Sequence, residues 1–182
     1  VVETGGLSTS GALSAREVNL TTAAGSVTMG AASTVTAVDR ITMSATGGNL
    51  ALRQLVTTGT GDGAGTISLS ATGSLTAVGS TIPHVSATNN VTMSAASVGT
   101  AAQSLGVQAP TLARLTASGD VFLAVSEKTA GTGFRVGQTA VTGGLTLTQA
   151  TGDLILTDAM NASRAILTAT DGDFTMIDGV TL

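Results

Sequence analysis

The amino-acid sequence predicts an all-β fold, a parallel β-helix (β-solenoid) of about seven coils that forms a single repeat array over residues 1–182. The first observation behind this prediction is a repeat. Two alternating apolar positions, a turn with glycine and two further apolar positions return roughly every two dozen residues, most regularly from Val18, Ile41 and Ile67. Repeats of this length with strand periodicity are typical of solenoids, in which each unit buries its apolar face against a neighbouring unit.

The second observation is the kind of apolar residue that the chain uses. Apolar residues make up 42% of the sequence, but they include only three Phe and no Trp or Tyr. Aromatic side chains fill much of a wide globular core, so their scarcity predicts a narrow core between closely spaced walls. The alternation and the low content of charged residues, 10%, also argue against a disordered chain.

Each repeat is expected to contain two strands joined by a glycine corner. Ile41, Met43 and Ala45 alternate with polar residues and are expected to face inward. Corners such as Gly47–Gly48 suit tight bends, because glycine tolerates positive φ and a following Asn, Asp or Ser bonds the local backbone. A third, weaker strand closes each coil into a triangular tube. These third strands are expected at 35–38, 55–56, 82–85 and 105–107, and at Val136 with Val141.

The second apolar position of each repeat serves as a marker of the coils. The markers are Leu20, Met43, Leu69, Met93, Leu115, Leu147 and Leu167. The step from Leu115 to Leu147, 32 residues, is the longest and predicts an insertion. Ser126 to Gly137 is its most polar and glycine-rich part, so a protruding loop is expected at 126–137.

The charge and cysteine content exclude several classes of partner and site. Seven Lys and Arg are scattered along a chain of net charge −4, which does not favour binding to nucleic acid. No apolar run approaches the ~18 residues of a membrane span. The absence of Cys excludes disulfides and thiolate metal sites. A start at Val1 without a signal peptide suggests a mature product or an excised segment.

Three units, 41–52, 145–156 and 165–176, share the pattern apolar-x-apolar, glycine with Asn or Asp, apolar-x-apolar. They resemble the degenerate repeats of filamentous-haemagglutinin-like exoproteins, and the resemblance covers roughly residues 17–176. It implies a right-handed parallel β-helix that forms the shaft of a large secreted or surface-exposed bacterial protein, often exported by two-partner secretion. Neither Pro83 nor Pro110 follows Asn, unlike the Asn-Pro motifs of that family's secretion domain, and no functional residue carries over.

No residue is assigned a catalytic, cofactor-binding or metal-binding role. His84, the single histidine, is expected to be an exposed loop residue rather than a ligand or an acid–base group. Residues 60–67 and 170–174 faintly resemble calcium-binding nonapeptide turns. Such sites occur in tandem, so these isolated copies are expected to be ordinary corners.

Three further features are expected to serve the surface. The acidic group Asp153, Asp158, Asp171, Asp173 and Asp178 is expected to be a solvated end rather than the carboxylate pair of a glycosidase. The outward hydroxyls Thr28, Thr42, Ser68, Thr92, Thr146 and Thr175 are interrupted by Ala51 and Phe122, and are expected to form a soluble face rather than an ice-binding or surface-binding ladder. The outward residues Phe122 and Ile155 are candidates for a lateral contact.

The expected function is structural and non-enzymatic, without a cofactor. The chain is expected to be a shaft segment of a bacterial adhesin or extracellular matrix fibre, as in a biofilm, which presents loops outside the cell or on its surface. Further coils of the same chain, or other copies stacked end to end, are the expected partners, since neither end carries a helix or a lysine-rich cap. Surface glycans or proteins are possible receptors. A polysaccharide-active β-helix enzyme and a glycan-binding or calcium-binding module are the alternatives.

Overall fold

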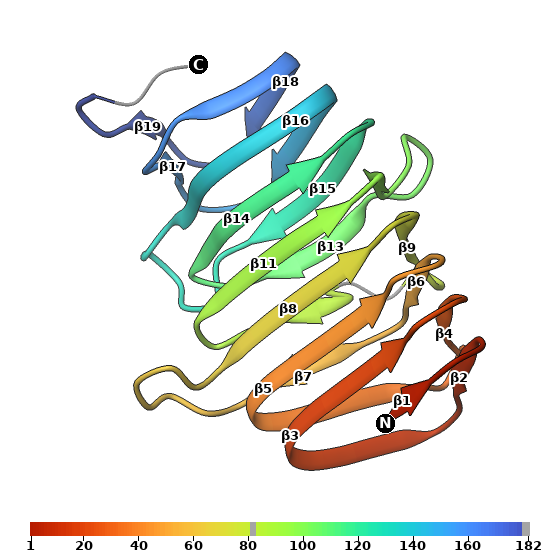
Figure 1. Cartoon of the computed structure of the whole chain (residues 1–182). Coiled ribbons are helices and arrows are strands. Elements are labelled where there is room, and N and C mark those ends of the chain that lie inside the picture. Colours follow the sequence, from red (N-terminus) through yellow and green to blue (C-terminus); the bar gives the residue numbers. More distant parts are fainter. Residues whose placement is uncertain (81–82, 180–182) are drawn as a thin grey trace.

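The computed structural model describes residues 1–80 and 83–179, which form a tall stack of β-coils (Figure 1). The described residues contain no helix, and their strands all belong to one parallel sheet that winds through about eight turns. The predicted all-β fold, a parallel β-helix, is therefore confirmed. The strands are β1 (Val2–Glu3), β2 (Leu7–Thr9), β3 (Ala12–Thr22), β4 (Val27–Met29), β5 (Thr34–Ala45), β6 (Leu50–Leu52), β7 (Leu55–Thr57), β8 (Thr66–Ala71), β9 (Ser74–Ala77), β10 (Val85–Ser86), β11 (Asn90–Ala95), β12 (Ser97–Val98), β13 (Leu105–Gln108), β14 (Thr111–Ala117), β15 (Val121–Ser126), β16 (Phe134–Gln149), β17 (Leu154–Leu156), β18 (Met160–Ala169) and β19 (Phe174–Met176).

Three sides make up the early coils, and each side is a ladder of parallel strands. Side A stacks β1, the ends of β3 and β5, then β8, β11, β14 and parts of β16 and β18. Side B begins with β2, β4, β6, β9 and β12. Side C stacks the beginnings of β3 and β5 with β7, β10 and β13. Each strand thus bonds to strands about one turn earlier and later in the chain.

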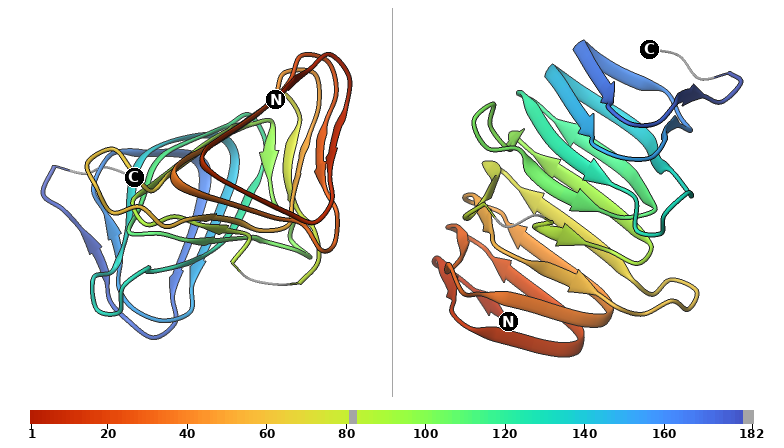
Figure 2. Two further views of the ribbon diagram at one scale, coloured as in Figure 1. Left: turned by 90° about the horizontal axis from the view of Figure 1, so that it is seen from below. Right: turned by 180° about the vertical axis from the view of Figure 1, so that it is seen from behind.

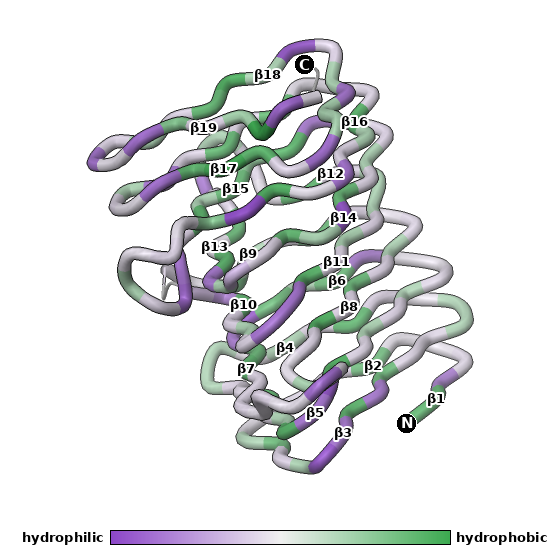
Figure 3. The backbone as a smooth tube through the Cα atoms, turned by 90° about the vertical axis from the view of Figure 1, so that its left-hand side faces the viewer, coloured by the Kyte–Doolittle hydropathy of each residue, from purple (hydrophilic) through white to green (hydrophobic). Residues whose placement is uncertain are grey.

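The inward positions of these ladders form one continuous core. On side A the column through Leu20, Met43, Leu69, Met93 and Leu115 is buried, and the parity predicted for Ile41, Met43 and Ala45 is confirmed. Small and branched side chains suffice because the facing walls are close together. Figure 3 shows hydrophilic stretches that are short and distributed from the first coil to the last.

The cross-section of the tube changes in the second half of the chain. Strand β15 pairs with both β12 and β13, through Val98–Val121 and Leu105–Leu123, so one straight strand continues sides B and C. A new side, side D, then branches from side A: the beginning of β16 pairs with the first residues of β14, and the ladder continues through β17 and β19. Seen from below, the last coils enclose an area displaced sideways from that of the first coils (Figure 2).

This change makes two of the predicted coil markers wrong. Leu147 and Leu167 stack on Leu123 on the merged sides B and C. The residue that follows Leu115 on side A is Thr139, only 24 residues later. Thr139 is inward and buried but polar, and its hydroxyl donates to the carbonyl of Gly137 (3.2 Å). A pattern of apolar positions does not include such a residue. The apparent step of 32 residues from Leu115 to Leu147 therefore reflects a change of side and not an insertion.

The predicted loop at 126–137 is correspondingly too long. The segment between β15 and β16 is 127–133, whereas Ser126 ends β15 and 134–137 begin β16. Phe134 and Val136 are fully buried in the core. The shorter loop folds around the carboxylate of Glu127, which accepts the backbone N–H groups of residues 131–133 at 2.8–3.0 Å.

The predicted third strands are largely confirmed. Strands β5, β7 and β13 cover the segments expected at 35–38, 55–56 and 105–107. Of the segment expected at 82–85, only Val85 lies in a strand, β10, because Pro83 and His84 precede it and Ile82 lies outside the described residues. Val136 and Val141 do not form a third strand. Both lie in β16, Val136 on side D with Leu156 and Val141 on side A with Ala117.

Candidate functional site

His84 is a buried residue, which corrects the expectation of an exposed loop histidine. Its side chain is 1% exposed and lies just before β10. Nδ1 accepts the N–H of Gly106 in the next coil (3.1 Å), and Nε2 donates to the carbonyl of Gly79 (3.2 Å). Both partners are backbone groups, Gly79 in the same connection between β9 and β10 and Gly106 in the next coil, and the residue types around His84 in the sequence give no sign of them. His84 is a neutral bridge that ties a loop to the stack.

Acid is expected to weaken this bridge. Burial lowers the pKa of His84 below its ordinary value of 6.5, and the nearby Arg53 guanidinium also lowers it. Protonated Nδ1 could also no longer accept the hydrogen bond from the Gly106 N–H. The unfolded chain takes up this proton below pH about 6.5 and the folded chain only at lower pH, so the free energy of unfolding should fall as the pH decreases through this range.

The measurement is the melting temperature between pH 7.5 and 5.5, for the native chain and for His84→Gln. Glutamine does not titrate, so the variant should show a smaller loss of melting temperature on acidification. Equal losses for the two proteins would contradict the role of His84.

The aspartates of the two calcium-like turns lie far apart. Asp62 is exposed in the loop between β7 and β8, and Asp171 and Asp173 are exposed beside β19 at the other end of the stack. Among the described residues there is no group of three or more His, Asp or Glu placed to hold a metal ion. The five aspartates of the acidic group are all exposed, as predicted, and the backbone N–H of Asp173 donates to the carboxylate of Asp153 in the preceding coil.

A recurring hydrogen bond joins successive coils at the glycine corners. The side chain that follows a corner glycine accepts the backbone N–H of the residue stacked on it in the next coil. We call these side chains corner acceptors. They are Ser26 for Asn49 N–H (3.0 Å), Asn49 for Ser74 N–H (2.7 Å), Asp120 for Gly144 N–H (2.8 Å) and Asp153 for Asp173 N–H (2.9 Å).

The corner acceptors have a clear physical role. Where the backbone turns between two sides, an amide leaves the regular ladder between strands and needs another acceptor. At these corners the side-chain oxygen of Ser, Asn or Asp supplies it. Sequence reasoning assigned these residues to local bonds within their own turn. The signal that would have located them is the repeated order of glycine, Ser, Asn or Asp, and an apolar residue.

Removal of a corner acceptor should cost a moderate amount of stability. We expect Asn49→Ala to lower the free energy of unfolding by about 1 kcal/mol, because Ser74 N–H loses its acceptor. Asn49→Asp keeps an oxygen in the same place and serves as the matched control. Urea denaturation of the three proteins measures their free energies of unfolding. If Asn49→Asp loses as much stability as Asn49→Ala, the side-chain oxygen of residue 49 is not the group that stabilises the corner.

A charged groove lies beside the first coils, between sides C and A. Its ion pairs join neighbouring coils, Arg16 Nε to Asp39 (2.6 Å) and Arg40 Nη2 to Glu17 (3.2 Å). With the loop at 59–64 they enclose about 620 Å³. Each carboxylate of these pairs faces a guanidinium, and the lining includes no aromatic side chain to stack on a sugar. This groove therefore lacks the features expected of a glycosidase cleft.

The outward hydroxyls are more regular than the sequence suggested. Thr42, Ser68 and Thr92 form one column on side A, and Ser44, Ser70 and Ser94 form a second column beside it. In the first column the hydroxyl of Thr92 donates to that of Ser68 (3.1 Å). Ala51 and Phe122 do not interrupt these columns, because both belong to side B. The predicted interruption holds for Thr28 and Thr146, which stack with Ala51 and Phe122, and not for the two columns of side A.

The two outward apolar residues do not come together. Phe122 is stacked with Thr146 and Ile166 on the merged sides B and C. Ile155 lies on side D, where its Cδ1 closely approaches Gly133. They do not form one lateral patch. In the part of the chain that the structure describes, no helix has the length and apolar character needed to cross a membrane.

Comparisons with known proteins add no identification to this geometry. No protein-family model, curated protein or solved structure matches the chain.

Proposed function

We propose that the chain is a structural shaft segment of a secreted or surface-exposed bacterial adhesin or extracellular matrix fibre, in which it acts as a rigid spacer. The observation that supports this proposal is the continuity of side A, whose ladder runs through eight strands from β1 to β18. At ~4.8 Å per strand this ladder spans roughly 35 Å. A continuous ladder gives a stiff rod, since bending it requires breaking hydrogen bonds between coils.

The loops between strands support the second part of the proposal, the presentation of surfaces to partners. The segments 58–65, 99–104 and 127–133 leave the ladder between strands (Figure 1). Segments of this kind vary without disturbing the strands that they join, and binding residues often lie on them. The proposed receptors are glycans or proteins on host or bacterial surfaces. The proposed partners at the ends of the stack are further coils or further copies of the chain.

Rigidity is tested by the distance between two dyes on the isolated chain. The sequence contains no Cys, so Ser10→Cys and Asp158→Cys introduce unique, exposed attachment points near opposite ends of the stack. We expect a single, narrow distribution of energy transfer at picomolar protein concentration, unchanged by calcium. A broad distribution would overturn the rigid spacer. A calcium-dependent shift, or cleavage of a polysaccharide, would instead favour the binding-module or enzyme alternative.

A further inference from the structure

The glycine corner before Leu145 leaves an open space on the lateral surface of the stack. A Cβ atom at Gly143 would lie 2.5 Å from the carbonyl carbon of Gly119, so the close stacking of the coils requires this glycine. A Cβ atom at Gly144 would meet only Oδ1 of Asp120, at an ordinary contact distance of 3.5 Å. Gly144 also lacks the positive φ that favours glycine. Neither the backbone nor the stacking therefore requires Gly144, and the missing side chain leaves space that a ligand can occupy.

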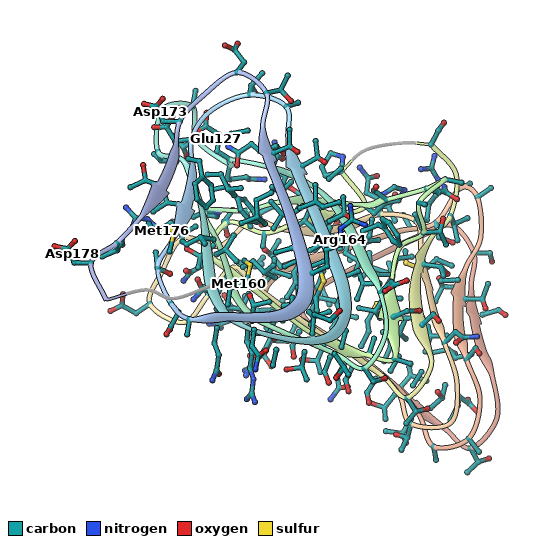
Figure 4. All side chains as sticks on the ribbon, turned by 90° about the horizontal axis from the view of Figure 1, so that it is seen from above. Glu127, Met160, Arg164, Asp173, Met176 and Asp178 are labelled. Carbon is teal, nitrogen blue, oxygen red and sulfur yellow. The ribbon has the colours of Figure 1, made fainter. Side chains whose placement is uncertain are left out.

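Gly144 lies between two charged side chains. It is stacked between Asp120 of the preceding coil and Arg164 of the following coil, and its alternation with the buried Leu145 places it at an outward position. The Gly144 N–H donates to Oδ1 of Asp120 (2.8 Å), which leaves Oδ2 able to accept from a ligand. Figure 4 shows Arg164 on the outer side of β18 and the buried Met160 on its inner side. A carboxylate and a guanidinium thus border the open space along the stack.

An aromatic ring lies beside this space. Phe122 is the next outward residue of β15 after Asp120, and Thr146 and Ile166 stack on it in the two following coils. Phe134 and Phe174 occupy inward positions, so among the described residues Phe122 is the one Phe on the lateral surface. We call the hollow the Gly144 groove, and it is lined by Asp120, Phe122, Gly144, Thr146, Arg164 and Ile166. It encloses about 360 Å³, which is within the range of small-molecule sites.

The Gly144 groove opens sideways and does not depend on where the described stack ends. Its floor, Gly144, lies in β16 between the coils of β15 and β18, both of which are described. A further coil would stack on Arg164 and Ile166 along the axis, because successive coils continue the ladder. Such a coil would lengthen the groove and would not cover Gly144.

The charges and the ring together select the chemical class of the ligand. The carboxylate of Asp120 repels an anion and the guanidinium of Arg164 repels a cation, so a ligand between them is neutral overall. The net charge of −4 also disfavours anionic polymers. The ligand has to offer a donor to Asp120, an acceptor to Arg164 and an apolar face to Phe122. A sugar residue combines all three, since its hydroxyls both donate and accept and its C–H groups form an apolar face.

From these observations we propose that the Gly144 groove binds one residue of a neutral glycan. The C–H face of the sugar lies on the Phe122 ring, one hydroxyl donates to Oδ2 of Asp120, and the guanidinium of Arg164 donates to a neighbouring hydroxyl. This inference rests on the proposed function, in which glycans are among the receptors, and it names the class of glycan and the contact site.

Titration of the isotope-labelled chain with neutral hexasaccharides, followed by NMR, tests the proposal. The probes are cellohexaose, xylohexaose, maltohexaose and chitohexaose, and hexagalacturonate is the anionic comparison. At least one neutral probe should bind with a millimolar or lower Kd and shift the signals of the Gly144 N–H and the Phe122 ring. Hexagalacturonate should bind more weakly, because Asp120 repels its carboxylates.

Variants locate the binding in the groove. Gly144→Val fills the open space and should abolish the shifts. Thr142→Val is the matched control, because Thr142 is an exposed residue of the same strand outside the groove. Phe122→Leu keeps an apolar side chain without a ring and should weaken binding about fivefold or more. Melting temperatures establish that the variants are folded, and if Gly144→Val unfolds, Gly144→Ala and Phe122→Leu take its place.

The outcomes separate this inference from the proposed function. The groove is not a site for a neutral glycan if no neutral probe shifts the Gly144 signal at millimolar concentration, if hexagalacturonate binds best, or if Thr142→Val weakens binding as much as Gly144→Val. If the energy-transfer distribution remains narrow in that case, the rigid shaft stands without this site. A broad distribution overturns the shaft whether or not the groove binds a sugar.

Discussion

Leu69→Asp is expected to lower the free energy of unfolding by at least about 4 kcal/mol, enough to unfold many small proteins. Leu69 lies in the middle of side A, 1% exposed, between Met43 and Met93 of the neighbouring coils. The substitution removes its packing against both neighbours. It also places a carboxylate inside the apolar core, where none of the described Lys or Arg residues is buried.

The matched control for this substitution is Ser70→Asp. Ser70 is the next residue of β8 and is exposed on the outer surface of the same strand. The same side chain there should change stability by less than about 1 kcal/mol. Chemical denaturation of both variants measures the difference. If the two substitutions cost the same, the inward and outward positions assigned to side A are reversed or the coil does not form.

Gly48→Ala is expected to cost about 2–3 kcal/mol through overpacking. A Cβ atom at Gly48 would lie 2.6 Å from the carbonyl carbon of Gly25 and 2.6 Å from the hydroxyl of Ser26 in the coil below. The backbones of the two coils cannot move apart at the corner, because the β-ladders on both sides of it hold the coils at the strand spacing. Even a methyl group therefore has to push the coils apart.

Gly61→Ala provides the control for the glycine substitution. Gly61 is in the protruding loop between β7 and β8, where a Cβ would meet no atom within 4 Å. This variant should leave the melting temperature nearly unchanged. The comparison tests close stacking at the corners directly, and a silent Gly48→Ala would mean that the corner is more open than the structure indicates.

The sequence alone was sufficient for the architecture of the coils. Ile41, Met43 and Ala45 alternate with polar residues, and alternation of this kind indicates an extended strand with one buried face. The glycine corners, the narrow core and the stacking of repeats follow from the same local pattern. Each of these features depends on neighbours within one turn of the chain, which is why a single sequence sufficed to predict them.

The candidate sites were less predictable, because their partners are backbone groups in other coils. His84 looked isolated in the sequence, yet it binds Gly106, 22 residues later. Asp153 looked like part of a solvated acidic end, yet it accepts the N–H of Asp173 in the next coil. No local property of either residue specifies such a partner. The stacking of the coils has to be known first.

Which side of the tube each repeat occupies was decided only by the tertiary structure. The motif in residues 145–156 has the same order of residues as that in residues 41–52, but it turns the corner from the merged sides B and C to side D instead of the corner from side A to side B. The motif specifies a strand, a corner and a strand, and any two adjacent sides of the tube satisfy it. Which side it occupies depends on the strand beneath it. On side A the residue stacked on Leu115 is Thr139. This polar residue is acceptable inside the core because its hydroxyl donates to the carbonyl of Gly137.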